Sequence, residues 1–389
     1  MAWERINGQE RQISVLRRAI KTNRLPNAFL FTGPEGVGKE AVAIELAKVL
    51  NCDSPNALLT AEACEKCESC KKISALKHPN LEFIFPVEKI LLEKTSETGA
   101  DRAKQEDALE RMKALLEEKR RNPYHSLRMD KAMGILKDQI LLLQEKAAYK
   151  PLAGKKRVFI LSQAESMNEA SANKLLKLLE EPPPYVLFIL VSSQPEMLLP
   201  TIVSRCQPLR FSKLRPEEIR EFLERQSFSL EADAERFIAS FSRGNLNHVV
   251  QMAFQSVENR EKPELQRTRD EALQLLRMLL SRDRGHEVIR QVEQFSKRDK
   301  TRDEQRQILL AMLRIFQDVV RKQNAPNETG LVNADIETAI SKFAQNFPDA
   351  DFESAVKETE SAIYKIGRNA NPFLTFSALC IKLKTFLTR

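Results

Sequence analysis

The sequence predicts an α/β domain built on a parallel sheet, followed by two helical domains. Three short apolar runs support the first part, each suited to a strand buried on both faces of such a sheet: residues 28–32, 157–161 and 186–191. After Phe211 the composition changes, and apolar residues recur at helical spacing towards the end of the chain. With 389 residues, 42% of them hydrophobic, the chain is long enough for two or three domains.

Helical and strand patterns alternate along the first half of the chain. A helical pattern at residues 13–20 precedes the first strand, and a helix over 41–50 follows it. Residues 81–85 alternate like a further strand. A helix over 168–181 lies between the last two strands and is ended by three prolines. This alternation is typical of parallel strands joined by helices.

The domain boundaries are predicted from these changes of pattern. The α/β domain contains a cysteine-rich module at 51–72 and a charge-rich insertion at 87–130, with an exposed helix expected at 105–120. A polar stretch at 256–264 is interpreted as a linker. The three domains are expected at residues 1–211, 212–255 and 265–389.

A glycine-rich segment lies directly between the strand at 28–32 and the helix after it. Gly33, Gly36, Gly38 and Lys39 fit the spacing G-x-x-x-x-G-K. Glycines let backbone N–H groups curl around phosphate oxygens, and the lysine reaches the terminal phosphates. In this strand–turn–helix setting the pattern predicts a phosphate-binding P-loop, with ATP as the candidate ligand.

Three positions of this P-loop site depart from an active ATPase. The residue after the lysine should be a Ser or Thr that holds Mg²⁺, and here it is Glu40. An Asp and a catalytic Glu are expected at the end of the strand 157–161, where the chain has Ser162 and Gln163. Neither supplies a carboxylate for general base catalysis, and Glu165 nearby is interpreted as a surface residue. The sequence predicts very poor hydrolysis and leaves open whether ATP binds.

Four of the six cysteines lie within 19 positions: Cys52, Cys64, Cys67 and Cys70. Four thiolates at this spacing suit a tetrahedral Zn²⁺ and imply no open coordination position. In a reducing compartment such a cluster indicates metal ligands before disulfides, so a structural zinc is predicted over a group of free thiols. The other two cysteines are expected to be small core residues.

The formal net charge of +8 permits contact with nucleic acid but is weak support by itself. The basic runs Lys119–Arg121 and Lys155–Arg157 would be the footprint of a nucleic-acid-binding module, although a solvated surface is the preferred interpretation. No run of about 18 apolar residues and no signal-peptide pattern is visible, so we expect no membrane span and a cytoplasmic protein.

Five segments occur in a recognisable order over roughly residues 1–210. They are residues 3–9, residues 24–34, the cysteine cluster, the box Asn173–Pro183 and the motif Ser204-Arg205-Cys206. Together they resemble the clamp-loader subunits of bacterial DNA polymerase III, which are AAA+ proteins. The combination is far more specific than any one segment.

The resemblance implies a fold and a mechanism for replication. The P-loop domain would be of AAA+ type, residues 212–255 its helical lid, and residues 265–389 a collar that holds a pentamer. ATP sites in such pentamers lie between neighbours, and the arginine of the Ser204-Arg205-Cys206 motif acts in trans as an arginine finger. Arg205 is therefore the candidate catalytic residue. The implied partners are the motor (gamma/tau) and delta subunits, the sliding clamp and, through the assembly, primed DNA.

Among the subunit types, the departures resemble delta-prime. Motor subunits keep a Thr after the P-loop lysine, acidic residues after the later strand, and a sensor Arg at the position of Asn247. This chain departs at all of these positions and keeps Arg205. The expected role is a stator that helps load the clamp and is weak or inactive in ATP hydrolysis. An ATP-hydrolysing motor subunit stays as the alternative, whereas the motif and the box argue against an unrelated P-loop regulator.

Overall fold

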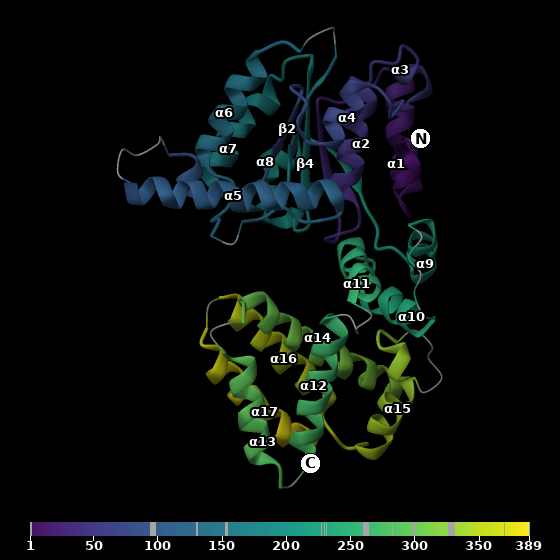
Figure 1. The fold of residues 1–389 in the computed structure, drawn as a ribbon, viewed down its shortest axis with the longest axis vertical. Helices are drawn as coiled ribbons and strands as arrows, with labels where there is room; N and C mark the ends of the chain where they lie inside the picture. The colour runs from purple at the N-terminus through teal and green to yellow at the C-terminus, as the bar shows by residue number, and fades with distance from the viewer. Residues whose placement is uncertain are drawn as a thin grey trace. The chain divides into compact units, whose positions relative to one another are not determined.

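A computed structural model gives the fold (Figure 1). It describes residues 2–93, 99–129, 131–151, 155–226, 228, 230, 232–259, 264–281, 283–297, 300–325, 331–368 and 370–388. The chain divides into two compact units. One comprises residues 1–222 with 244–248, and the other comprises residues 223–243 with 249–389.

A five-stranded parallel sheet lies at the centre of the first unit. Its strands are β1 (Ala28–Thr32), β2 (Leu81–Ile84), β3 (Arg157–Leu161), β4 (Val186–Ser192) and β5 (Gln207–Arg210). Their order is β2-β3-β4-β1-β5, and every neighbouring pair runs parallel. Since parallel strands end at the same edge, the segments that follow β1 and β3 emerge together, separated by β4 alone.

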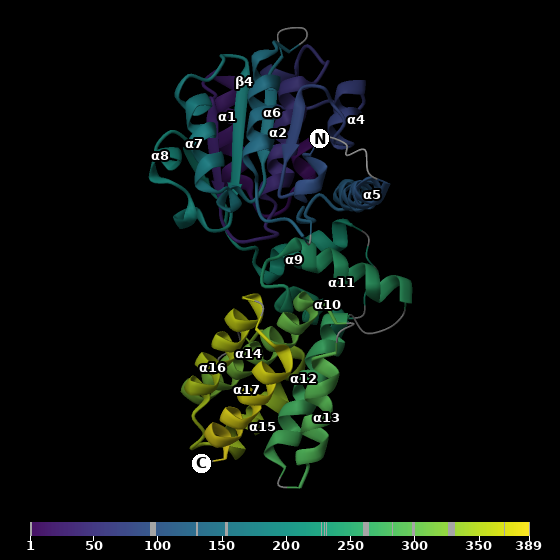
Figure 2. The same cartoon turned by 90° about the vertical axis from the view of Figure 1, so that its left-hand side faces the viewer.

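Helices cover both faces of this sheet. They are α1 (Glu10–Lys21), α2 (Lys39–Asn51), α3 (Ala57–Thr60), α4 (Glu68–Ser74), α5 (Gly99–Arg121), α6 (Lys137–Ala148), α7 (Glu169–Glu180) and α8 (Pro200–Val203). Figures 1 and 2 show α6 and α7 on one side of the sheet and α1 and α2 on the other. Leu30, Phe159 and Phe188 form one core with Ile140 of α6 and Leu175 of α7. The predicted parallel α/β domain is confirmed.

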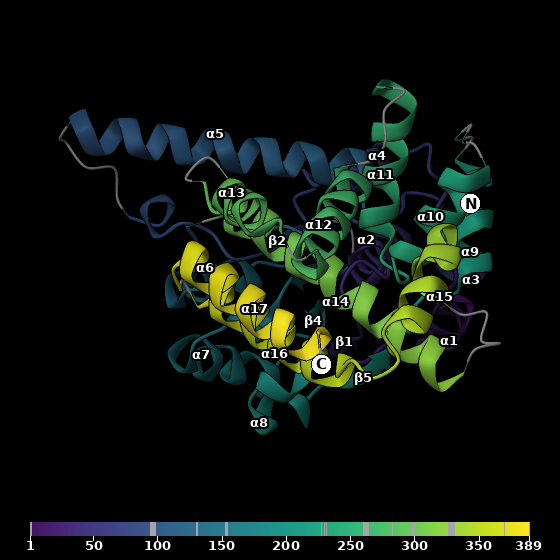
Figure 3. The same ribbon diagram turned by 90° about the horizontal axis from the view of Figure 1, so that it is seen from below.

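The remaining helices are α9 (Pro216–Arg225), α10 (Ala232–Phe241), α11 (Leu246–Asn259), α12 (Glu264–Leu280), α13 (Gly285–Phe295), α14 (Arg302–Asn324), α15 (Glu337–Asn346), α16 (Phe352–Gly367) and α17 (Pro372–Leu387). In the second unit α14 packs against α12, α15 and α16 (Figure 3). Its buried stripe includes Ile308, Met312 and Phe316, which supply the centre of the helical core. After Phe211 the described part of the chain contains helices and no strands, as predicted.

Two details differ from the sequence prediction. The predicted linker at 256–264 is longer than the gap between the helices, because α11 continues to Asn259 and α12 begins at Glu264. Residues 260–263 lie outside the described residues. The strand β5 was not predicted, because only Leu209 of its four residues is buried and no apolar run marks it. The division into domains at 211, 255 and 265 stays a prediction. Among the described helices, none is long and apolar enough to cross a membrane.

Candidate P-loop site and cysteine cluster

The predicted P-loop connects β1 to α2, and its shape requires glycine. Gly33, Gly36 and Gly38 have φ angles of 144°, 70° and 98°, which L side chains rarely adopt. A Cβ on Gly33 would lie 2.4 Å from the carbonyl oxygen of Phe211, and one on Gly36 would lie 1.9 Å from Asn245 Oδ1. The glycines are therefore needed for the backbone and for close packing, whether or not a phosphate binds.

Lys39 is the first residue of α2, and its side chain lies inside the loop. Its Nζ donates to the carbonyl oxygens of Gly33 at 2.6 Å and Pro34 at 2.5 Å. Burial lowers the pKa of the Lys39 ammonium to about 8, an effect that the carboxylate of Glu40 partly opposes. The lysine that would bind phosphates is thus satisfied by its own loop.

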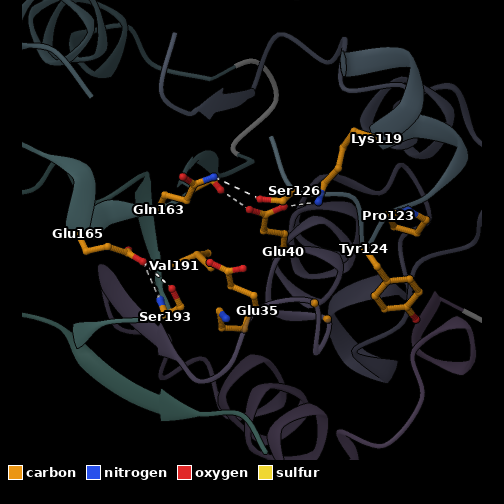
Figure 4. A pocket seen from close by; sticks show the side chains of 14 residues that line it. Glu35, Glu40, Lys119, Pro123, Tyr124, Ser126, Gln163, Glu165, Val191 and Ser193 are labelled. Carbon is orange, nitrogen blue, oxygen red and sulfur yellow. Dashed lines mark hydrogen bonds and ion pairs between the residues drawn. The ribbon is translucent and has the colours of Figure 1, made fainter. Parts of the chain in front are cut away.

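A pocket opens beside the loop, with about 470 Å³ of empty space when the part open to solvent is included. Figure 4 shows its side chains, which come from the P-loop, the segment after β3, the end of β4 and the insertion that contains α5. They belong to Glu35, Gly36, Gly38, Lys39, Glu40, Lys119, Pro123, Tyr124, Ser126, Ser162, Gln163, Glu165, Val191 and Ser193. The parallel sheet thus brings Glu40, Ser162 and Gln163 to one place, as the P-loop pattern requires.

Glu40 is held by two partners inside the pocket. Its Oε2 pairs with the ammonium of Lys119 from α5, and its Oε1 accepts a hydrogen bond from the hydroxyl of Ser162 (Figure 4). Lys119 is only 2% exposed, so the interpretation of its basic run as a solvated surface is wrong at this residue. Burial lowers the pKa of Lys119, and the Glu40 carboxylate acts in the opposite direction.

The magnesium ion of an active P-loop does not fit these side chains. Mg²⁺ demands near-octahedral oxygen ligands at about 2.0–2.1 Å. Both oxygens of Glu40 already accept hydrogen bonds, one of them from a buried ammonium that would repel a second cation. Ser162 offers a hydroxyl where the metal-binding Asp is expected.

Gln163 and Glu165 serve neighbouring loops. The Gln163 amide donates to the carbonyl oxygen of Leu127 at 3.0 Å and to Ser126 Oγ at 3.3 Å. Glu165 Oε1 accepts from the backbone N–H of Ser193 at 3.0 Å and from its hydroxyl at 2.7 Å. Glu165 is half-buried and lines the pocket, so its interpretation as a surface residue is wrong.

The segment that carries Asn247 closes on the P-loop from another side. The backbone N–H of Leu246 donates to the carbonyl oxygen of Gly36 at 2.9 Å. Asn247 Oδ1 accepts from Asn122 Nδ2 at 2.9 Å. Where a motor subunit is expected to present a charged sensor arginine, this chain has a neutral amide bound to its own insertion.

The Ser204-Arg205-Cys206 motif follows α8 and leads into β5. The Arg205 guanidinium donates to the carboxylate of Glu180 at 2.8 Å and to the carbonyl oxygen of Thr201 at 3.0 Å, and its side chain is 35% exposed. Ser204 Oγ donates to the same carbonyl at 3.1 Å, and burial raises the pKa of the Cys206 thiol to about 12. None of the fourteen residues lining this chain's pocket is Arg205. Arg205 therefore lies apart from the P-loop pocket, with its side chain partly exposed.

The four clustered cysteines come together as the sequence spacing predicted. The sulfur atoms of Cys52, Cys64, Cys67 and Cys70 all lie within 4.8 Å of one another. Backbone N–H groups point at these sulfurs, for example from Cys64 to Cys52 Sγ at 3.3 Å and from Cys70 to Cys67 Sγ at 3.4 Å. The backbone N–H of Cys67, which donates to Cys64 Sγ at 3.4 Å, and that of Lys66 lower the pKa of the Cys64 thiol to about 6. Four converging sulfurs with N–H donors around them fit a structural metal such as zinc.

Known proteins are similar to this chain along most of its length. The family described as DNA polymerase III, delta subunit, matches residues 8–215. The DNA polymerase III subunit delta' of Bacillus subtilis is 28% identical over 372 residues, which is 95% of each chain. The subunit tau/gamma of Haemophilus influenzae is 32% identical over 216 residues, covering 56% of this chain and 24% of that protein. A solved gamma subunit-related protein of Thermotoga maritima covers 96% of this chain and 99% of its own at 17% identity, with a TM-score of 0.42.

Proposed function

The chain belongs to the DNA polymerase III delta subunit family, as a clamp-loader subunit of the delta-prime type, and we propose that it acts as a stator in a cytoplasmic clamp loader. The stator helps to load the sliding clamp onto primed DNA without hydrolysing ATP itself. Its partners in this proposal are the motor (gamma/tau) and delta subunits of a hetero-pentamer. The relative named subunit delta' supports membership of such a complex.

One observation carries the proposal: Arg205 is partly exposed, while Ser162 and Gln163 stand where the chain's own site would need carboxylates. Arg205 lies outside the chain's own pocket and keeps its guanidinium partly exposed. A guanidinium directed at a neighbour's transferring phosphate stabilises the developing charge, and such fingers are worth about 10³–10⁵ in rate. Arg205 would therefore complete a site on the adjacent motor subunit.

The chain's own pocket supports the loss of hydrolysis. A general base must reach the attacking water, and Gln163 stands where that carboxylate is expected, with its amide already bound to Leu127 and Ser126. Glu40 is neutralised by Lys119, and Lys39 is bound to its own loop. Each group that would act on ATP has an internal partner instead.

Zinc is the metal that we propose for the cysteine cluster. Zn²⁺ prefers four thiolates in a tetrahedron, and the four sulfurs already converge with N–H donors around them. Its role there is structural, because all four positions would be filled by cysteine.

The test is ATP turnover by the chain alone and in a mixture with the motor subunits, the delta subunit, the clamp and primed DNA. We expect background turnover by the chain alone and DNA-stimulated turnover by the mixture. Arg205→Ala should lower turnover at the one site that Arg205 completes by about 10³ or more, so that the mixture loses the contribution of that site while the complex still assembles on a sizing column.

Arg210→Ala is the matched control, since Arg210 is an exposed arginine only five positions further along the chain. It should leave the turnover of the mixture unchanged. Turnover by the chain alone that disappears in Lys39→Ala would instead establish a motor subunit, and unchanged turnover of the mixture with Arg205→Ala would remove the finger role.

A further inference from the structure

The insertion between β2 and α6 supplies one wall of the P-loop pocket. Lys119 lies near the end of α5, and Pro123, Tyr124 and Ser126 lie in the segment that follows (Figure 4). A Cβ on Gly38 would meet Tyr124 Cε1 at 3.2 Å, so the insertion is packed against the loop itself. The insertion is therefore part of the site, although its sequence carries no nucleotide-binding motif.

Lys119 is held in this wall by contacts from three directions. Its ammonium pairs with Glu40, donates to the carbonyl oxygen of His125 at 2.6 Å, and lies 5.9 Å from the ring centroid of Phe83. The side chain has no exposed surface. A buried ammonium is stable only when it is paired, and the same is true of the carboxylate it faces. The pair therefore fixes the end of α5 to the start of α2.

The arrangement around Glu40 resembles the Mg²⁺ site of an active P-loop, except that the carboxylate and the hydroxyl stand at each other's positions. An active P-loop holds Mg²⁺ between a hydroxyl on the loop and an acidic side chain at the end of a later strand. Here the loop carries the carboxylate of Glu40, the strand end carries the hydroxyl of Ser162, and the two are hydrogen-bonded. The carboxylate and the hydroxyl are both present, and the positive charge beside them comes from Lys119.

We propose that Lys119 occupies a latent divalent-cation site: its ammonium takes the place of Mg²⁺ beside Glu40 and excludes metal-bound nucleotide from the pocket. The two cations cannot share one carboxylate without repelling each other. A metal-free triphosphate would be repelled as well, because three carboxylates line the pocket against two ammonium groups: Glu35, Glu40 and Glu165 against Lys39 and Lys119. The insertion thus keeps the pocket closed to both forms. This inference rests on the proposed loss of hydrolysis but concerns binding by the chain alone.

The test removes the ammonium and asks whether a metal site appears. Lys119→Met keeps an unbranched apolar stem, and Lys113→Met on the exposed face of the same helix is the matched control. Zinc-loaded full-length chains would be titrated with Mn²⁺, followed by electron paramagnetic resonance, and then with ATP in Mg²⁺ or in EDTA, followed by calorimetry. We expect Mn²⁺ to bind Lys119→Met at least tenfold tighter than the wild-type or control chain. Mg²⁺ should then strengthen ATP binding to Lys119→Met only.

A second variant identifies the ligand. In Glu40→Gln/Lys119→Met the gain in Mn²⁺ affinity should disappear, because the carboxylate that would bind the ion has been removed. Since both charges of the pair are removed together, neither is left buried without a partner. A folded Lys119→Met that gains no Mn²⁺ affinity overturns the proposal. So does micromolar, Mg²⁺-dependent ATP binding by the wild-type chain, a measurement that does not depend on whether any variant folds. Loader turnover enters none of these measurements, so the stator role is tested separately.

Discussion

At the scale of single residues, Arg205 is held by its own chain in a way that a partner can replace. Its ion pair with Glu180 is partly exposed on both sides, with 35% and 49% of the two side chains accessible. Surface pairs of this kind contribute about 0–1 kcal/mol. The guanidinium is therefore oriented at little cost and remains able to turn towards a more strongly charged phosphate group.

Arg205→Lys separates the shape of the guanidinium from its charge. A lysine ammonium keeps the positive charge but loses the planar fork that binds two oxygens at once. We expect turnover at the site that Arg205 completes to fall more than tenfold, with a change of less than about 1 kcal/mol in the unfolding free energy of the isolated chain. The measurements are turnover of the assembled mixture and urea denaturation. Near wild-type turnover with lysine would mean that charge alone suffices.

At the scale of elements, the sequence shows most clearly those strands that are buried on both faces. β1 and β3 were predicted with the bounds that the structure gives, because every residue of each strand is at least partly buried and the runs are apolar. The sequence does not predict β5, because three of the four residues of this strand are exposed. A short edge strand of this kind has no periodic signal.

The same contrast holds for the site. The P-loop glycines with Lys39, and separately the four cysteines, are local patterns with fixed spacing. The sequence therefore predicts which residues of each group lie close to one another. The pair of Lys119 with Glu40 joins residues 79 positions apart. Nothing in the charged run around Lys119 distinguishes a buried ammonium from a solvated one, and only the docking of α5 on the P-loop decides it.

The cysteine module depends on how its helices are connected. Cys52 follows the last residue of α2, and Cys67 is the N-cap of α4, accepting the N–H of Cys70. A metal bound to both would tie the two helices together. We expect Cys67→Ser to lower the zinc content from about one per chain to well below one half, and to lower the thermal midpoint of the isolated chain.

Cys380→Ala is the control for this change, because Cys380 is a buried core cysteine of α17 outside the cluster. Its zinc content should stay at about one per chain by elemental analysis. A folded wild-type chain without zinc, prepared in the absence of chelators, would refute the metal site.

At the scale of the whole molecule, three cations of the two basic runs are bound within the chain. Lys119 is buried against Glu40. Lys155 pairs with Asp53 and donates to the carbonyl oxygen of Asn51 at 2.9 Å, and Arg157 donates to the carbonyl oxygen of Lys146 at 2.8 Å. Much of the charge in these runs is used to connect elements within the first unit.

This use of charge predicts how the isolated chain behaves with DNA. Non-specific binding depends on lysines and arginines that are free to displace counterions, and the affinity then falls steeply with salt. We expect the chain alone to leave primed DNA unbound at about 10 µM protein and about 0.15 M salt, in fluorescence anisotropy. The mixture with the motor and delta subunits should bind the same DNA, because the contacts would come from the assembly. Tight binding by the chain alone, with a steep dependence on salt, would contradict this prediction and favour a nucleic-acid-binding module.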